Sequence, residues 1–348
     1  MAPDHEHGSS RAAESISRRP RRLLLLAGTT GASFIVLITI VFYSWVLRAG
    51  RDGDDDLGNR VPPGVLADYM PEDSAAVLVV NVRQLRETAM GRQNLWPSIQ
   101  QLTRQIERRL PWLRLAGINP LDDLDTLLIS FASKGSGEPI LLARGQFDRS
   151  RLQIGPDKLQ ESTLDHYRIW EYSEPDVKQT TLIALVGATL VVSETRSRVQ
   201  AALRQASDPQ PIRVHDTILR QMLAKVDRRQ SLWLAASIKG LGSISTIDNY
   251  LLKMILRPLA AHAESVYGGI AFTEDLQAEL HFSTCTDDDA DRLEADLKSI
   301  CEAAPGITLL GRNNELLPLL RLLAVGQISR EGKNILLRCR LTADQLEK

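Results

Sequence analysis

The chain has 348 residues, a length that corresponds to about two compact domains plus further segments. Apolar residues make up 43% and charged residues 24%, an ordinary globular composition that excludes wholesale disorder, a collagen-like repeat and a membrane protein with many spans. The 42 basic and 43 acidic residues nearly cancel. We therefore expect no nucleic-acid partner, because such a partner requires a strongly basic domain or stripe.

A run of 25 residues without a charge, from Leu23 to Leu47, predicts a transmembrane helix. At about 1.5 Å per residue the helix would be longer than the hydrocarbon core of a bilayer, which is about 30 Å thick. The run exceeds the apolar part of a signal peptide, and no small-x-small cleavage pattern follows it. We expect an uncleaved anchor.

Charges on either side of the span predict its orientation. Five arginines precede the span in the basic tail 1–22, and four aspartates follow it closely. The positive-inside rule places the tail in the cytoplasm and the rest of the chain in the extracytoplasmic, periplasmic space. This predicts a single-pass protein of the cell (inner) membrane, with membrane lipid as the partner of residues 23–47. Four small residues in the span would let two copies associate closely; they are Ala27, Gly28, Gly31 and Ala32.

Beyond the span, the chain predicts a tether and two modules. Residues 48–70 are rich in Asp, Pro and Gly and have neither a helical nor a strand period, which is typical of a tether. Residues 71–210 and 211–348 each show strand, helix, two strands, helix, further strands and a helix, and landmarks such as Val191 and Leu336 recur about 140 to 155 residues apart. The expected fold class is α+β, with two similar, duplicated modules that have mostly antiparallel sheets.

The expected elements follow from apolar periodicity. In the first module we expect strands at 75–82, 126–131, 139–147, 167–172, 182–186 and 189–193, and helices at about 95–110 and 195–205. In the second module we expect strands at 231–238, 266–272, 277–283, 322–329 and 334–341, helices at 247–261 and 287–304, and a terminal helix that starts at a capping box of Thr342 and Gln345. The runs 75–82 and 231–238 are apolar enough for strands covered on both faces.

Two phrases of the sequence carry a family resemblance, MPEDSAAVLVVNVRQL and GINPLDDLDTLLIS. Together with the basic tail, the single span and the tether, they resemble single-pass membrane-anchored envelope proteins common in planctomycete bacteria. The resemblance covers most of the chain. It implies a bacterial envelope protein and supplies no catalytic residue.

Three acidic motifs resemble metal-binding sequences, at 52–56, 123–125 and 287–291. The first lacks the Gly and the final Glu of an EF-hand loop. The second is a DxD pair without a nucleotide-binding turn, and we interpret it as a connecting turn. The third follows Thr286, so its carboxylates fit the first turn of a capped helix better than a calcium loop. We predict no metal site and no cofactor.

Histidines and cysteines give no catalytic motif. The chain has no G-x-S-x-G, Walker loop, H-E-x-x-H or S-x-x-K sequence, so we predict no catalytic residue, although an active site assembled from distant residues stays open. His281 should lie on the polar face of its strand. The three cysteines, Cys285, Cys301 and Cys339, all fall in the second module, where an oxidising compartment would permit one disulfide and leave one thiol. Cys301 continues an apolar helical stripe and should be buried.

The sequence favours a membrane-tethered extracytoplasmic binding or scaffold protein, with a protein partner in the envelope. Two alternatives stay open: an envelope hydrolase whose site is not visible as a local motif, and a carrier of an apolar ligand in a groove between the modules. A hydrolase should have a polar cleft of converging titratable groups, a carrier an apolar cavity, and a scaffold an exposed apolar patch.

Overall fold

The computed structural model describes most of the chain from Leu66 onward. The described residues are 66, 69–88, 112–113, 116–120, 122–133, 139–148, 150, 159–173, 180–207, 214–240, 250–310, 317–342 and 345. The predicted tail, span and small-residue pairs, the helix at 95–110 and the acidic motif at 52–56 lie outside these residues. Among the described helices, none is long and apolar enough to cross a membrane.

The described strands form one sheet, in which every pair of neighbours is antiparallel. The strands are β1 (Ser74–Val80), β2 (Leu124–Ala132), β3 (Pro139–Gly145), β4 (Leu159–Leu164), β5 (Tyr167–Ser173), β6 (Thr180–Val186), β7 (Thr189–Ser193), β8 (Leu232–Ser237), β9 (Ala263–Phe272), β10 (Leu276–Thr284), β11 (Gln327–Glu331) and β12 (Asn334–Leu341). Their order is β11-β12-β10-β9-β8-β1-β2-β3-β7-β6-β5-β4. The fold is therefore α+β and antiparallel, as predicted.

The strands of the two predicted modules join at the centre of this sheet. β1 pairs with β8, with Leu78 opposite Leu234. The sequence predicts separate sheets for the modules, and this part of the prediction is wrong. Both central strands are apolar on both sides, so edge-to-edge pairing hides the hydrogen-bonding edge of each and leaves helices and loops to cover the two faces.

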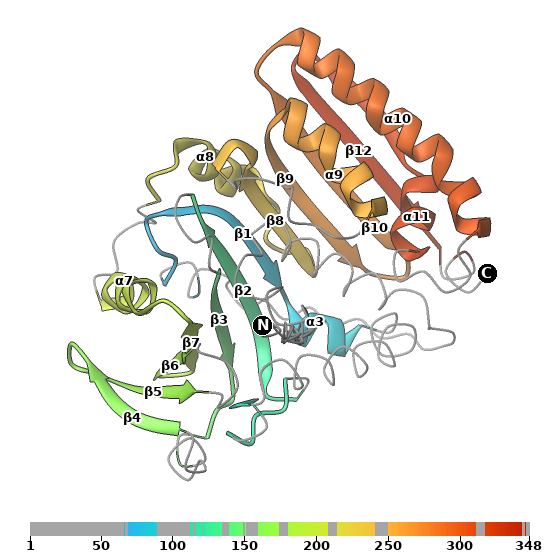
Figure 1. Ribbon diagram of the computed structural model, residues 1–348. Helices are drawn as coiled ribbons and strands as arrows, with labels where there is room; N and C mark the ends of the chain where they lie inside the picture. Colours follow the sequence, from blue (N-terminus) through green and yellow to red (C-terminus); the bar gives the residue numbers. More distant parts are fainter. Residues whose placement is uncertain are drawn as a thin grey trace, which may run out of the picture.

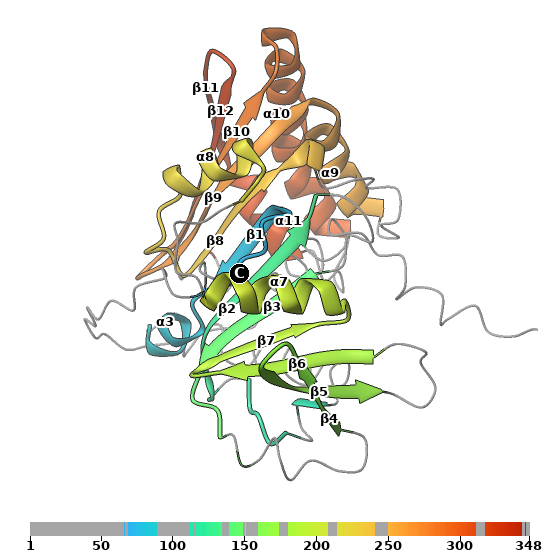
Figure 2. The same cartoon turned by 90° about the vertical axis from the view of Figure 1, so that its left-hand side faces the viewer.

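Helices cover the two faces of the sheet unequally (Figure 1). They are α3 (Val82–Glu87), α7 (Arg196–Ser207), α8 (Thr217–Lys225), α9 (Tyr250–His262), α10 (Asp287–Leu310) and α11 (Leu317–Ala324), with a 3-10 turn at Ile238–Gly240. We call the side of the sheet that carries α7 and α8 the α7 face, and the opposite side the α10 face. In Figure 1 the α7 face is on the left and the α10 face, with α9, α10 and α11, is on the right; Figure 2 views the α7 face.

The core has three clusters, two on the α10 face and one on the α7 face. On the α10 face, α10 and α11 pack on the second half of the sheet, where Phe272 and Phe282 are buried. The segment that contains Trp112 covers the first half of the same face. On the α7 face, α7 and α8 pack on residues such as Val79 and Trp233.

The folded body includes residues that the sequence assigns to the tether. Leu66, Tyr69 and Met70 are 3%, 8% and 1% exposed and belong to the α7-face cluster. Chain entry into the body is therefore on the α7 face. The tether prediction extended too far because these three apolar residues lie between Pro, Gly, Asp and Glu and show no period.

Most other predicted elements match observed ones within a few residues, whereas β4, α3 and α8 have no predicted counterpart. The edge strand β4 has few apolar residues, and α3 and α8 are short. The signal for α8 was present, because Asp216 accepts a hydrogen bond from the backbone N–H of Leu219 and caps the helix. The strand expected at 322–329 is corrected: its first residues belong to α11, and β11 begins only at Gln327.

The same strand order occurs on both sides of the centre. Outward from β1 the order is β1-β2-β3-β7-β6, and outward from β8 it is β8-β9-β10-β12-β11. Val191 and Leu336 hold the same place in these two orders, as partners of Leu142 and His281. The halves differ in what joins these strands: the hairpin of β4 and β5 extends the first half, whereas α10 and α11 lie between β10 and β11 in the second.

Candidate functional site

Corresponding rows of side chains on the α7 face have opposite character in the two halves. In the first half, one row across β2, β3, β7 and β6 is apolar and buried; it consists of Leu128, Leu142, Val191 and Ala184. In the second half, the corresponding row across β9, β10, β12 and β11 is partly or fully exposed; it consists of Tyr267, His281, Leu336 and Ser329. The second half therefore presents a polar surface where the first half has a core.

α7 explains the buried row. It follows β7, packs on β7 and β6, and buries Val199, Ala202 and Leu203 against the sheet. On the second half, α8 contacts β8 and β9, and no described helix packs on the α7 face of β10, β12 or β11. We call the α7 face of β10, β12 and β11, together with the part of β9 beside α8 that carries Tyr267, the open face.

The residues of the open face alternate with buried ones along each strand. On β10, Gln277 and His281 point to the open face, while Ala278 and Phe282 are buried in the α10-face cluster. On β12, exposed Arg338 and Arg340 alternate with buried residues in the same way. This period of two is what a strand requires when one face is solvated. The predicted position of His281 on a polar face is confirmed.

A continuous chain of contacts crosses the open face. The rings of Tyr267 and His281 stack, with centroids 4.6 Å apart and an angle of 4° between the planes. The ammonium group of Lys225, at the end of α8, lies 5.8 Å from the centroid of the Tyr267 ring. Nε2 of His281 lies 2.7 Å from Oε1 of Glu279, and Nε of Arg338 donates to Oε2 of the same carboxylate at 3.0 Å.

Electrostatics keep the Glu279 carboxylate ionised. Burial raises its pKa, but hydrogen bonds from Arg338 and His281 outweigh burial, and the net pKa is lower than usual. Burial also raises the pKa of the Tyr267 hydroxyl, which stays neutral at physiological pH. Both hydrogen bonds stabilise the ionised form, so the carboxylate is a weaker general base than an ordinary glutamate.

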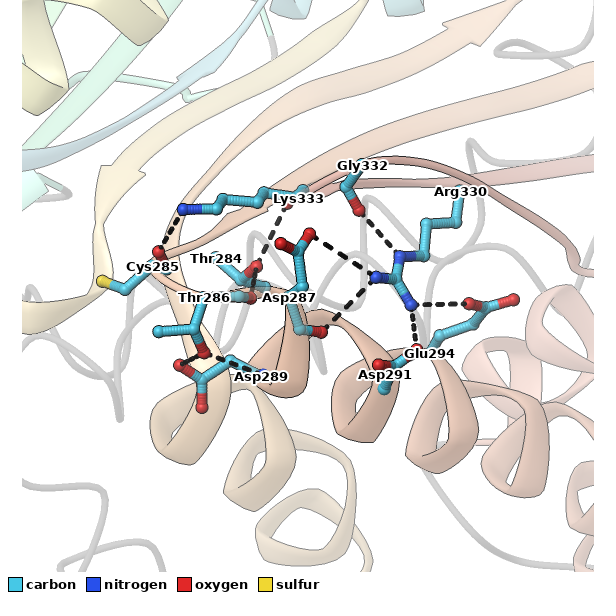
Figure 3. Close-up of polar contacts among 10 residues, drawn as sticks. All are labelled: Thr284, Cys285, Thr286, Asp287, Asp289, Asp291, Glu294, Arg330, Gly332 and Lys333. Carbon is cyan, nitrogen blue, oxygen red and sulfur yellow. Dashed lines mark hydrogen bonds and ion pairs between the residues drawn. The ribbon is translucent and has the colours of Figure 1, made fainter.

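A second polar cluster joins α10 to the hairpin of β11 and β12 (Figure 3). The Thr286 hydroxyl accepts a hydrogen bond from the backbone N–H of Asp289 at 3.0 Å and caps α10, so the predicted cap is confirmed. Arg330 pairs with Asp291, and its guanidinium nitrogens lie 3.7 Å from Asp287 and 3.8 Å from Glu294. These carboxylates hold the hairpin against the helix.

His262 and Lys239 extend the same cluster. Nδ1 of His262 lies 3.2 Å from Asp289, and hydrogen bonds from Thr286 and His262 lower the pKa of that carboxyl. Lys239 donates to the Cys285 sulfur at 2.7 Å, and this bond raises the pKa of the lysine. Lys333 donates to the backbone carbonyl of Cys285 at 2.8 Å. The cluster joins the 3-10 turn and the ends of α9 and β10 to α10 and the hairpin of β11 and β12.

All three cysteines are free. Cys301 is buried in the α10-face cluster, as predicted, and burial raises its pKa. Cys339 is buried on β12, where burial and the neighbouring Cys301 raise its pKa to about 12. Cys285 is half-buried. The buried thiols of Cys301 and Cys339 therefore behave as small apolar side chains.

The remaining sequence motifs are dispersed. The backbone N–H groups of Asp122 and Asp123 both donate to the carbonyl of Asn119, so the first half of the DxD motif lies in a turn, while Asp125 lies on β2 and pairs with Arg86 at 3.8 Å. His215 contacts Glu72, and neither residue belongs to the strands of the open face. Within the described parts of the chain, no three His, Cys, Asp or Glu side chains are grouped to hold a metal ion.

Comparison with known proteins gives no relative. The chain matches no protein-family model, no curated protein and no solved structure. The functional conclusion therefore depends on the open face alone. Sequence reasoning missed Tyr267, Glu279, Arg338 and Lys225 as a group because they come from four elements, and only the strand register brings them together.

Proposed function

We propose that the protein is a membrane-tethered extracytoplasmic binding protein, anchored through residues 23–47, and that the open face binds an envelope partner. The observation that carries this proposal is the contrast between the two halves of the α7 face. The first half covers the face with α7, whereas the second half leaves the same strands open and arrays polar side chains on them. The surface is polar, unlike the apolar patch expected from the sequence for a scaffold.

The proposal includes an internal duplication. The two halves share the same strand order and the same register between equivalent strands, which supports the duplication. Ile129 corresponds to Gly268 and Leu141 to Leu280, each 139 residues later. Val192 corresponds in the same way to Leu337, and Ile183 to Ile328, each 145 residues later.

The turns of the two outer hairpins support the duplication as well. Gly187 joins β6 to β7 with φ 59°, and Gly332, also 145 residues later, joins β11 to β12 with φ 57°. Both are the first residue of a two-residue turn, where a positive φ favours glycine. In a repeat of this kind, one copy contributes buried core to the body, and the surface of the other copy is available to bind a partner.

The chemistry of the open face favours binding over hydrolysis. Hydrogen bonds from His281 and Arg338 engage both oxygens of Glu279 and lower its pKa, which weakens this carboxylate as a proton acceptor. The same bonds fix these side chains on the surface of the sheet. Fixed side chains lose little entropy when a partner binds, which is the requirement for a recognition surface.

The experiment is labelling of single cysteines with a membrane-impermeant maleimide. In a Cys285→Ser background the two remaining thiols are buried, so Ser329→Cys reports on the open face and Glu302→Cys, exposed on α10, serves as the matched control. We expect both positions to react in intact spheroplasts, because the body is outside. Ser329→Cys should react at least about fivefold more slowly in cells than in purified protein, while Glu302→Cys reacts equally in both.

Two outcomes would contradict the proposal. Absence of labelling at both positions until the cells are lysed would overturn the orientation. Equal rates for Ser329→Cys in cells and in purified protein would show that no partner covers the open face.

A further inference from the structure

We propose that the open face binds an extended acidic peptide segment, with Lys225 and Arg338 as the contacting cations and Glu279 and His281 as positioning residues. The inference rests on the proposed function, since it names the chemistry of the partner that the open face would take. The strands and α8 place these groups on one surface, and the hydrogen bonds and ring contacts described above hold them there.

The donors that stay available on the open face indicate an anionic ligand. Arg338 uses Nε for Glu279, which leaves its two terminal nitrogens directed away from that bond, and its side chain is 61% exposed. Among the described residues, Lys225 has the Tyr267 ring as its neighbour and no paired carboxylate. Glu279, the carboxylate between them, is occupied on both oxygens. Exposed Glu331 also lies on this face, but at its far end, opposite Asn334 and four residues along β12 from Arg338. Beside Lys225 and Arg338, a ligand therefore meets cationic donors.

The ring geometry argues against a stacked sugar or base. One side of the Tyr267 ring is covered by His281, and Lys225 lies over the ring as well. Stacking ligands need a ring face that is free, as in proteins that bind single-stranded nucleic acids. The aromatic pair instead supports the polar groups around it.

The separation of the two cations favours an extended ligand over a small anion. Lys225 lies beside Tyr267 of β9, and Arg338 is on β12, with β10 between these strands. Arg338 is in register with Gly269, two residues along from Tyr267, so the two positions are about 10 Å apart across the strands and roughly 12 Å apart in all. A single phosphate or carboxylate cannot contact both. Carboxylates four residues apart in an extended peptide point to the same side and are about 13 Å apart, which is close to this separation. An acidic peptide that crosses the strands can therefore reach both cations.

The test measures fluorescence anisotropy of a labelled octaglutamate peptide with the full chain in neutral-detergent micelles. We expect binding that weakens with salt, as for any contact between exposed charges. Lys225→Gln and Arg338→Gln should each weaken the affinity about three- to fivefold, the range of exposed charge pairs. Arg292→Gln, exposed on α10 on the other side of the sheet, is the matched control and should leave the affinity unchanged.

Octaglutamine and vesicles that contain phosphatidylglycerol complete the test. Octaglutamine should bind at least about tenfold more weakly than octaglutamate. The acidic-peptide site would be overturned by equal binding of the two peptides, or by a loss of octaglutamate affinity in Arg292→Gln as large as in Lys225→Gln and Arg338→Gln. Binding to vesicles but not to octaglutamate would overturn it as well. These results are distinguishable from failure of the proposed function, because protection of Ser329→Cys in cells reports a covered face whatever the chemistry of the partner.

Discussion

The two halves of the α7 face use one arrangement of strands for opposite purposes. In the first half, Ile140 and Leu142 of β3 lie under α7 and are fully buried. In the second half, the corresponding residues of β10 are Glu279 and His281, which lie on the open face and bond to each other. The difference teaches that the strand order sets the position of a side chain, whereas the covering helix decides whether that position must be apolar.

The largest difference in stability is expected when corresponding residues of the two halves are exchanged. Ile140→Glu places a carboxylate in a dry core and should lower the free energy of unfolding by about 4 kcal/mol or more, or prevent folding. The reciprocal change, Glu279→Ile, should cost less than about 1 kcal/mol, because the side chain there is partly solvated. Urea unfolding of the two variants checks the contrast, and similar costs would mean that the two positions have similar surroundings.

The second-largest effect on stability is expected at Met70, in the segment that leads into the folded body. Met70 is 1% exposed within the α7-face cluster, so Met70→Ala should cost about 2–5 kcal/mol through lost packing and a cavity. Gln277→Ala, exposed on the open face, is the control and should change stability by less than about 0.5 kcal/mol. If the unfolding midpoint shifts as little for Met70→Ala as for the control, residue 70 does not contribute to the core and belongs to the tether.

The two turn glycines should respond alike if the halves are equivalent. Gly187→Ala and Gly332→Ala meet no atom within 4 Å of the added Cβ, so the cost comes from the left-handed backbone alone and should be about 1–2 kcal/mol for each. Thermal unfolding of both variants measures it. A difference of more than about 1 kcal/mol between them would argue against equivalent hairpins.

The smallest effect concerns pH and is confined to the open face. The folded-state pKa of Glu279 is lowered, so its ion pair stabilises the protein above the unfolded-state pKa, near about 4.3, and this stabilisation is lost as the pH falls through the folded-state pKa. The stability advantage of the wild type over Glu279→Gln should therefore shrink between about pH 5 and pH 3. It should stay below about 1 kcal/mol, because the side chain is 39% exposed. An advantage that grows on acidification would contradict the assigned hydrogen bonds.

Local features of the fold could be predicted because they depend on neighbours in the chain. The alternation along β10 and β12 predicts which side chains face water, and Thr286 predicts the start of α10. The weakly apolar β4 and the short α3 and α8 were missed, because their stability comes from packing on the sheet and not from their own period. The separate sheets were wrong for a similar reason, since the apolar character of β1 and β8 shows that both strands are buried and does not show that they pair with each other.

The sequence by itself determined which residues of each strand are apolar, where α10 is capped and that Cys301 is buried. Only the tertiary structure decided that Tyr267, His281, Glu279 and Arg338 form one surface, because a register shift of one residue on β10 or β12 would turn these side chains to the other face. It also decided that α7 covers one half and leaves the other open. Hydrogen bonds between strands and the packing of a helix on a sheet join residues far apart in the chain, and no local pattern of apolar and polar residues records which partner each one meets.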